Sequence, residues 1–415
     1  MTLTVENALL DGERVRVRCE DGMIAAIGPE VTPRPGDETL DAGGAHLLPP
    51  LVNGHTHAGM TLFRGSGGDL PLMPWLEEKI WPIEAKLTDE DVYWGARLAC
   101  AEMLRTGTTR FWDMYWHPEA TARAVADAGL RATIGAPLFD LGGSPAQLRE
   151  MAHRGLEALA DCGPRVAPAL APHAIYTVSE ESLRWIGELS AEKQLPVQIH
   201  LSETEKEVQD CLAEHGERPA FYLDRVGLLS ERSVLAHGVW LDPDELALVA
   251  ERGATVVTNP VANMKLAVGG VFPHHAARTA GVAVGLGTDG AGSNDSLDLL
   301  SDLKTFALLQ KHAAADPTAI DAAEAWAVAT GARAPRLGAT PLEPGAPADF
   351  VLMRADSPEL GIGELMADLV YAATGAAVAG VVVAGEVPMR DGEVPGLEEV
   401  VARAAERARR LGLQP

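Results

Sequence analysis

The sequence predicts an α/β fold in which a (β/α)8 barrel is joined to a small β-sandwich domain built from both chain ends. Apolar, strand-like runs alternate with helical segments eight times between residues 49 and 344. Such an alternation over roughly 300 residues is typical of a closed barrel of parallel strands. Short strands and tight turns precede and follow this region, so we expect the two ends to pair. The predicted boundaries are 1–48, 49–344 and 345–415.

The two chain ends share a pattern of short strands. Asp11-Gly12 and Asp21-Gly22 separate alternating segments near the N-terminus, and Asp-Gly is a strong hairpin signal. Toward the C-terminus, short apolar runs that we interpret as strands return at 349–353, 369–372 and 380–383. A charged, amphipathic segment at 396–411 predicts a final helix, which we group with the small domain.

Polar residues follow the eight strand-like runs of the barrel region. The first run, 46–52, leads into His55 and His57. The other seven runs are 108–111, 131–138, 166–171, 196–199, 234–236, 254–257 and 282–287. In the same order, they lead into Asp113, Asp140, His173, His200, His237, Asn259 and Asp289. The carboxyl ends of the strands form the active-site face of such a barrel. We therefore expect the histidines to gather around one opening.

Four of these residues can share one divalent metal ion. His55 and His57 lie two apart on an extended chain, so their side chains point the same way. His200 and Asp289 follow the fifth and eighth runs, and a closed barrel brings those strand ends to the same mouth. Three neutral imidazoles and one carboxylate suit a catalytic metal that keeps an open position for water. No lysine follows the fourth run, which favours a single metal ion.

Glu203 and His237 are candidate catalytic residues. Glu203 closely follows the fifth-run histidine, and a carboxylate beside a metal-bound water can move a proton to the substrate. The alternative is an acid at a helix N-terminus, because Glu205 and Glu207 lie beside it. His237 can orient the attacking hydroxide, or it can be a buried structural histidine. Asp289 can both bind the metal and accept a proton from water.

The composition disfavours several other classes of function. The chain has 59 acidic and 34 basic residues and a formal net charge of −25. This charge argues against a nucleic-acid or anionic-membrane partner, because phosphate binding depends on clustered Lys and Arg. The four cysteines lie far apart, which predicts reduced thiols and a cytoplasmic location. We expect a small-molecule substrate, no signal peptide and no membrane span, and leave open whether the chain forms a homo-oligomer.

Several motifs carry a family resemblance. They are PLVNGHTH at 50–57, MTLFRG at 60–65, HLSETEKE at 200–207, AHGVW at 236–240, TNPVANMK at 258–265 and GLGTDG at 285–290. On these motifs the chain resembles the 5-methylthioadenosine/S-adenosylhomocysteine deaminases of the amidohydrolase superfamily, over nearly its whole length. Triazine chlorohydrolases and guanine deaminases share much of the pattern. The resemblance implies a metal-dependent hydrolase barrel that deaminates adenosine, 5′-deoxyadenosine, 5′-methylthioadenosine or S-adenosylhomocysteine to the inosine analogue and ammonia.

The resemblance also implies roles for single residues. The metal-binding group contains His55, His57, His200 and Asp289. The catalytic group contains Glu203, His237 and Asp289, and the substrate-binding group contains Glu84, His173 and Trp75. The implied metal is zinc, one ion per subunit, with iron or manganese as alternatives. In the catalytic group Glu203 is the proton shuttle, with His237 beside the hydroxide. In the substrate-binding group Glu84 binds the ribose hydroxyls, His173 contacts the nucleoside and Trp75 lines the pocket.

Some features leave the substrate open. Relatives that take S-adenosylhomocysteine are expected to hold its carboxylate with arginines near the third strand, but Ala136 stands there and Arg149 lies downstream. The alternative activity is the same chemistry on guanine, a pterin or a triazine, and Glu84 discriminates because a free base has no ribose. A non-enzymatic scaffold is disfavoured, because all four metal ligands and Glu203 are present. The glycine-rich loop 66–69 would permit movement over a substrate.

Overall fold

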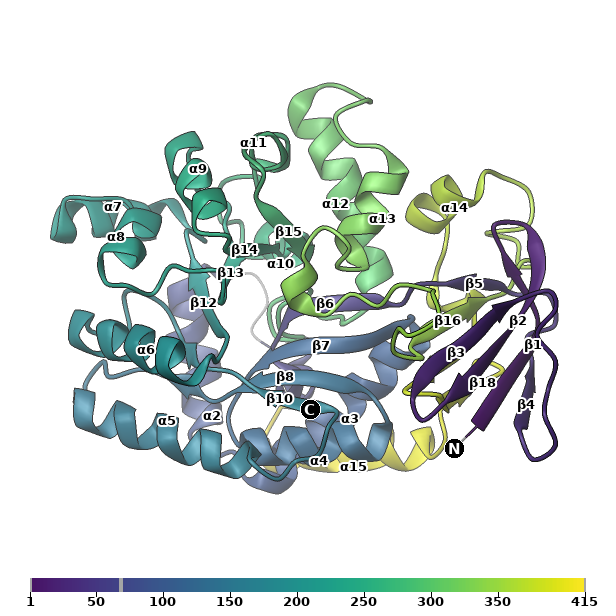
Figure 1. Cartoon of the computed structure of the whole chain (residues 1–415). Helices are drawn as coiled ribbons and strands as arrows, with labels where there is room; N and C mark the ends of the chain where they lie inside the picture. Colours follow the sequence, from purple (N-terminus) through teal and green to yellow (C-terminus); the bar gives the residue numbers. More distant parts are fainter. Residues whose placement is uncertain (1, 67–69, 414–415) are drawn as a thin grey trace.

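A barrel of parallel strands and a β domain of mixed strands make up the chain (Figure 1). The structure is a computed structural model, and it describes residues 2–66 and 70–413. The predicted α/β fold, with a small domain from both chain ends, is confirmed. Most of the loop 66–69, which we expect to move, lies outside the described residues.

The barrel strands form two parallel sheets and a bridging pair. The first sheet contains, in spatial order, β10 (Val166–Pro168), β8 (Arg131–Gly135), β7 (Thr108–Met114) and β6 (Leu51–Thr56). The second sheet contains β12 (Val197–Leu201), β13 (Ser233–His237), β14 (Thr255–Thr258) and β15 (Ala283–Leu286). β9 (Pro137–Leu138) and β11 (Ala171–Pro172) extend β8 and β10 and pair with each other. A parallel bridge between Leu170 and Val197 joins the sheets. The ring closes where the N–H of Asp289 donates to the carbonyl of His55 at 3.0 Å.

The first strand-like run is two strands in the structure. β5 (His46–Leu48) pairs with β1 (Thr2–Leu10) and β16 (Phe350–Met353) in the small domain, whereas β6 begins the barrel. Pro49-Pro50 lies between them, and proline has no N–H to donate to a sheet ladder. The single strand predicted over 46–52 is therefore wrong, although β6 still delivers both histidines.

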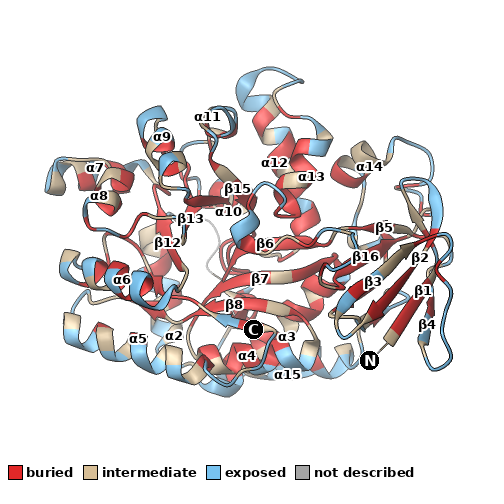
Figure 2. Cartoon of the chain, in the orientation of Figure 1, coloured by how far each residue is buried: buried red, intermediate tan, exposed pale blue. Residues whose placement is uncertain are grey.

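Helices cover the outside of the barrel. The longer ones are α3 (Asp89–Arg105), α4 (Pro118–Ala128), α5 (Pro145–Leu159), α6 (Glu180–Lys193), α7 (Glu205–His215), α8 (Pro219–Arg225), α9 (Pro243–Glu251), α11 (His274–Ala280), α12 (Leu299–Ala314) and α13 (Ala322–Ala329). Figure 2 shows their outward faces exposed, while the strands inside are buried. Side chains cap the N-termini of α3 and α6, because the hydroxyls of Thr88 and Ser179 accept the N–H groups of Asp91 and Ser182.

The small domain joins both ends of the chain in one eight-stranded sheet. Its order is β18 (Glu386–Arg390), β17 (Val378–Val383), β16, β5, β1, β2 (Glu13–Glu20) and β3 (Met23–Gly28), with β4 (Glu38–Asp41) on β1. Strands from the two ends share one apolar core, which includes Val5, Val17, Phe350 and Val382. The strand predicted at 369–372 is wrong, because most of this run lies in α14 (Leu365–Tyr371), a helix that the Glu364 side chain caps. We keep the boundaries 1–48, 49–344 and 345–415 as a proposal, supported by the change of sheet between β5 and β6.

The final helix packs against the barrel. α15 (Leu397–Leu411) lies below α3 in Figure 1. Arg410 donates to the carboxylate of Asp91, a fully buried residue of α3, and Arg407 pairs with Glu90 at 2.7 Å. Leu411 joins an apolar cluster of the barrel side. The helix itself is predicted correctly, but it packs against α3 of the barrel, whereas we group it with the small domain from the sequence.

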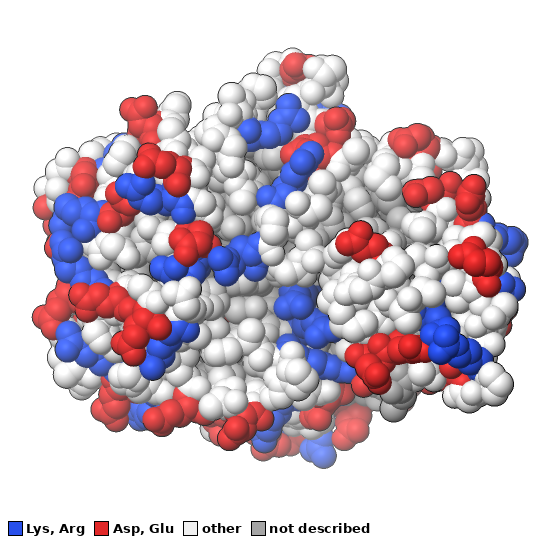
Figure 3. Space-filling model, in the orientation of Figure 1, with Lys and Arg blue, Asp and Glu red and all other residues white. Residues whose placement is uncertain are grey.

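Charged side chains of both signs are interspersed over the face drawn in Figure 3. All four cysteines are unpaired. Within residues 2–66 and 70–413, no helix is long and apolar enough to span a membrane.

Candidate active site

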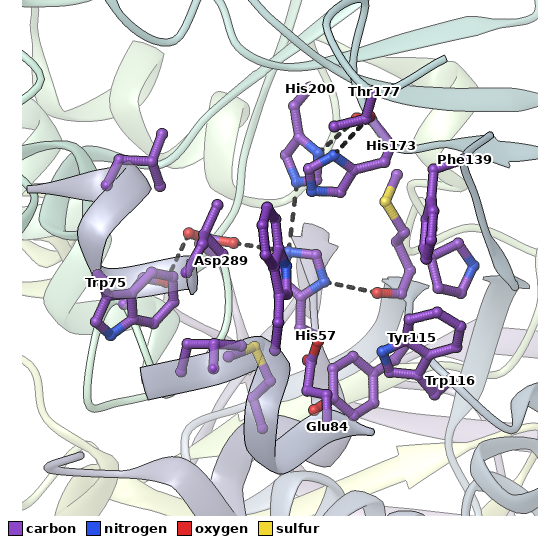
Figure 4. Close-up of a pocket in the computed structure, with 18 of the residues that line it drawn as sticks. His57, Trp75, Glu84, Tyr115, Trp116, Phe139, His173, Thr177, His200 and Asp289 are labelled. Atoms are coloured by element: carbon purple, nitrogen blue, oxygen red, sulfur yellow. Dashed lines mark hydrogen bonds and ion pairs between the residues drawn. The ribbon is translucent and has the colours of Figure 1, made fainter. Parts of the chain in front are cut away.

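Five side chains from neighbouring strand ends converge at the barrel mouth. His55 and His57 come from the end of β6, His200 from β12 and His237 from β13, and Asp289 follows β15. The ligand atoms of His55, His200, His237 and Asp289 all lie within 4.8 Å of one another. Nε2 of His57 lies 3.1 Å from Oδ1 of Asp289 and 3.4 Å from Nε2 of His200. Figure 4 shows His57, His200 and Asp289 turned toward one another.

His55 gives the clearest sign that a cation fits this cluster. Its side chain is 1% exposed, and neither ring nitrogen has a hydrogen-bond partner among the described residues. Nε2 lies 3.4 Å from Oδ1 of Asp289. A buried polar atom without a partner is costly, and ligation of a metal ion would satisfy it. The donor set of imidazoles and a carboxylate suits a divalent catalytic metal.

Backbone carbonyls fix the orientation of two of the rings. Nδ1–H of His57 donates to the carbonyl of Met114 at 2.6 Å, and Nδ1–H of His200 donates to the carbonyl of His173 at 2.7 Å. With the proton on Nδ1, Nε2 keeps its lone pair for the cluster. Contacts of this kind orient the histidine ligands of metal sites.

Burial and local charges give His55, His200 and Asp289 the protonation that a metal site needs. Burial lowers the pKa of His55 to about 4 and holds the pKa of His200 well below its usual value. Burial alone would also lower the pKa of His57, but its contact with Asp289 raises it to about 9, so this ring must lose a proton to bind a metal ion. Burial alone would raise the pKa of Asp289, but its close contacts with the rings of His55 and His57 hold it well below its usual value. The hydroxyl of Ser293 also donates to Oδ2 of Asp289 at 2.6 Å. Neutral imidazoles and an ionised carboxylate are the forms that bind metals.

Glu203 lies beside the cluster and is almost fully buried. Its Oε2 is 4.0 Å from Nε2 of His237, and both residues line the same cavity. Nδ1–H of His237 donates to Oδ1 of Asn263 at 2.8 Å. Burial, followed by the charge of Asp289, raises the pKa of Glu203 to about 8. A carboxyl with a pKa near neutrality can both accept and donate a proton at pH 7.

A cavity of about 610 Å³ opens over the cluster. Glu84, His173 and Trp75 line it together with Glu203 and His237, so the structure brings all the predicted substrate and catalytic residues together. Burial raises the pKa of Glu84. Figure 4 shows Glu84 close to Tyr115. A cavity of roughly 300–1,000 Å³ with apolar walls and a few polar groups is typical of a small-molecule site.

The chain matches the amidohydrolase family model over residues 46–387. The chain belongs to the amidohydrolase family. A 5′-deoxyadenosine deaminase of Methanoregula boonei is 49% identical over 399 residues, which cover 94% of this chain and 90% of that relative. A 5-methylthioadenosine/S-adenosylhomocysteine deaminase 1 of Archaeoglobus fulgidus is 41% identical over 402 residues, which cover 95% of this chain and 94% of that relative. The predicted family is therefore confirmed.

Two solved structures share the fold of this chain. An adenosine deaminase from Xanthomonas campestris with bound zinc has a TM-score of 0.92 at 35% identity, covering 100% of this chain and 98% of that one. An atrazine chlorohydrolase from Arthrobacter aurescens, complexed with zinc, has a TM-score of 0.90 at 22% identity, covering 98% and 100%. This second likeness concerns the fold alone.

Several polar residues near the strand ends of this amidohydrolase do not join the site. Asp113 is fully buried and accepts the N–H of Ala58 at 2.6 Å, so it stabilises the turn after β6.

Arg149 donates to Glu181 at 2.9 Å, and neither it nor Ala136 lines the cavity. No Lys or Arg stands among the described residues of the cavity wall. The structure therefore presents no cation there to a negatively charged part of a substrate.

The sequence does not predict most of the aromatic wall of the amidohydrolase cavity. Tyr115 and Trp116 follow β7, Phe139 follows β9, and Trp81 begins the short helix α2 (Trp81–Glu84). For three of them the available signal is their place just beyond a strand end, because such residues reach the active-site face of a barrel. Trp81 carries no comparable signal.

Proposed function

We propose that the protein is a zinc-dependent amidohydrolase that converts adenine nucleosides to their inosine analogues and ammonia. The observation that carries the proposal is the meeting, in one cavity, of a buried His–Asp cluster and the Glu203 carboxyl, whose pKa is about 8. The choice of substrate is supported by relatives named 5′-deoxyadenosine deaminase and 5-methylthioadenosine/S-adenosylhomocysteine deaminase.

We assign His55, His57, His200 and Asp289 as the ligands of one zinc ion. The support is their convergence, the unpartnered nitrogens of His55 and the low pKa of Asp289. A zinc ion held by these residues would lower the pKa of a coordinated water toward neutrality and so would supply a nucleophile at pH 7. His237 orients this water in our assignment, because Asn263 fixes its ring with Nε2 on the side of Glu203.

Glu203 moves the protons in the proposed reaction. It takes a proton from the attacking water and delivers it to the ring nitrogen next to carbon 6, while the water oxygen bonds to carbon 6. Asp289 accepts the second proton of that oxygen, and this proton then passes by way of Glu203 to the amino group, which returns both carboxyl groups to their starting forms. The carbon–nitrogen bond then breaks and ammonia leaves. One water is consumed and one ammonia is released, and the ring keeps a carbonyl at carbon 6.

Glu84, His173 and Trp75 bind the nucleoside in this proposal. A carboxylate offers acceptors on both oxygens, so Glu84 can accept hydrogen bonds from two neighbouring ribose hydroxyls. Nδ1 of His173 pairs with Oγ1 of Thr177 at 3.0 Å, which fixes the ring at the cavity wall. Trp75 supplies an apolar surface for the base. The support for these roles is that all three side chains line the cavity beside Glu203.

We further propose a cytoplasmic location and no nucleic-acid partner. The unpaired state of Cys19, Cys100, Cys162 and Cys211 supports a reducing compartment. The net charge of −25 supports the absence of a phosphate-binding surface.

Ammonia release from the zinc-loaded protein tests the proposed activity. The substrates are adenosine, 5′-deoxyadenosine, 5′-methylthioadenosine, S-adenosylhomocysteine, adenine, guanine and a pterin. We expect turnover confined to the adenine nucleosides. Turnover of free bases or pterins alone would contradict the role of Glu84 and move the activity to another aminated heterocycle.

A further inference from the structure

Glu207 is a buried acid that takes no part in the proposed proton transfers. It is the third residue of α7, and its side chain is almost fully buried. Its Oε1 accepts the N–H of Ser202 at 2.9 Å, and its Oε2 accepts the N–H of Glu203 at 2.8 Å. Among the described residues, it forms no ion pair with Lys or Arg. Both carboxylate oxygens are thus committed to the backbone that carries Glu203.

The turn that Glu207 holds has an unusual backbone. Ser202 has a φ of 50°, a left-handed conformation that residues with a side chain seldom adopt. The carbonyls of this turn are held as well, because Leu201 accepts the N–H of Gly238 at 3.0 Å and Ser202 accepts the N–H of Trp240 at 2.9 Å. The reversal at Ser202 lets Glu203 leave the end of β12 and line the cavity.

A carboxylate suits this turn better than other side chains. In a capping box the third helical residue reaches back to the N–H of the N-cap residue. Here Oγ1 of Thr204, the N-cap residue, accepts the N–H of Glu207 at 3.2 Å, but the Glu207 carboxylate reaches past Thr204 to two earlier N–H groups. Two N–H donors need two acceptors, whereas an amide side chain has one acceptor and one donor.

We propose that Glu207 is a positioning residue that fixes the Ser202-Glu203 backbone and so sets the place of the Glu203 carboxyl at the substrate. This inference rests on the proposed function, because the proton-transfer role of Glu203 is part of that function. Glu207 acts through Glu203 and does not touch the substrate, since it is absent from the cavity wall.

A double-mutant cycle tests this role. The four zinc-loaded proteins are the wild type, Glu203→Gln, Glu207→Gln and the double variant, each assayed for kcat and KM with 5′-deoxyadenosine. We expect Glu207→Gln to lower kcat by about 10- to 100-fold, because a misplacement of about 1 Å is enough for such a loss. KM should change less than about threefold, and zinc content should stay at the wild-type level. On the Glu203→Gln background, Glu207→Gln should lower kcat by less than about twofold, because its partner is already lost.

Two further variants complete the test. Glu205→Gln removes an exposed acid from the same first turn of α7 and should keep the wild-type kcat. Glu207→Asp keeps the charge but shortens the reach, and it replaces Glu207→Gln in the cycle if that variant does not fold. Equal fold losses on both backgrounds would show a general structural role and overturn the proposal, as would a wild-type kcat in Glu207→Gln. A wild-type kcat in Glu203→Gln would instead overturn the proton-shuttle role itself, and the positioning role with it.

Discussion

His274 should make the protein less stable as the pH falls below about 6.5, the usual pKa of histidine. Its side chain is 2% exposed, and neither ring nitrogen has a hydrogen-bond partner among the described residues. Its Nε2 lies 3.7 Å from Oε1 of Glu324. Burial lowers the pKa of His274 to about 4, even though the charge of Glu324 raises it. The folded protein therefore accommodates the neutral ring.

The sign and size of the effect follow from this pKa. The unfolded chain takes up a proton at this histidine below pH 6.5, whereas the folded protein does so only near pH 4. Between these values the unfolded state binds more protons, so the free energy of unfolding falls with falling pH. One pKa unit corresponds to about 1.4 kcal/mol, so lowering the pH from about 7 to 5 removes about 2 kcal/mol through this residue.

Urea denaturation at the two pH values measures this loss. The proteins compared are the wild type, His274→Gln and His275→Gln, a matched control because His275 is exposed and adjacent in α11. Losses from other titrating groups are common to all three proteins and cancel. The loss in His274→Gln should be smaller than in the wild type by about 2 kcal/mol, whereas His275→Gln should match the wild type. Equal losses in all three proteins would refute the reasoning.

Four other predictions concern the site. Glu203→Gln should keep its zinc by elemental analysis and lose about 10²–10⁴-fold in kcat, and near wild-type turnover would remove Glu203 from the mechanism. His55→Ala and His57→Ala should each lower the zinc content, and full occupancy would contradict the ligand assignment. Glu84→Ala should lower kcat/KM for adenosine by about 10- to 100-fold, because hydrogen bonds to a charged group are lost. An unchanged kcat/KM would contradict the proposed binding of the ribose by Glu84. S-adenosylhomocysteine should have a kcat/KM at least about tenfold below that of 5′-deoxyadenosine, because no cation lines the described cavity wall to meet its carboxylate; equal values would show that its tail stays in solvent or finds another partner.

The metal cluster could be predicted from the sequence because strand ends of a barrel converge by geometry. His55, His57, His200 and Asp289 need only the strand runs and their order to be placed together. Glu84 could not be found that way, because it lies in a short helix away from any strand end, and only the family resemblance indicated it. The approach of His237 to within 4.8 Å of the ligand atoms of His55, His200 and Asp289 depends on ring orientation, which Asn263 sets from a later helix.

Two features of the fold were beyond local sequence patterns. Apart from His46 the run 46–52 is apolar, so hydrophobicity predicts one strand, and the sheet change at Pro49-Pro50 depends on partners far along the chain. The amphipathic segment at 396–411 predicts a helix with one apolar face, but the pattern does not say which surface covers it. That surface is α3, where the carboxylate of Asp91 pairs with the guanidinium of Arg410.

The pairing of the two chain ends has a consequence for how the protein is made. Asp91 and Arg410 are 319 positions apart, and β5 lies between an early strand, β1, and a late one, β16. While the chain emerges from the ribosome, the first hairpin and the helix that carries Asp91 therefore exist long before their partners. The barrel units can form in order, but the small sheet and the contact beneath α3 close only after the last helix has been released. Until then one edge of the early sheet and one buried acid remain open to solvent, which makes the end of synthesis the moment at which this fold becomes complete.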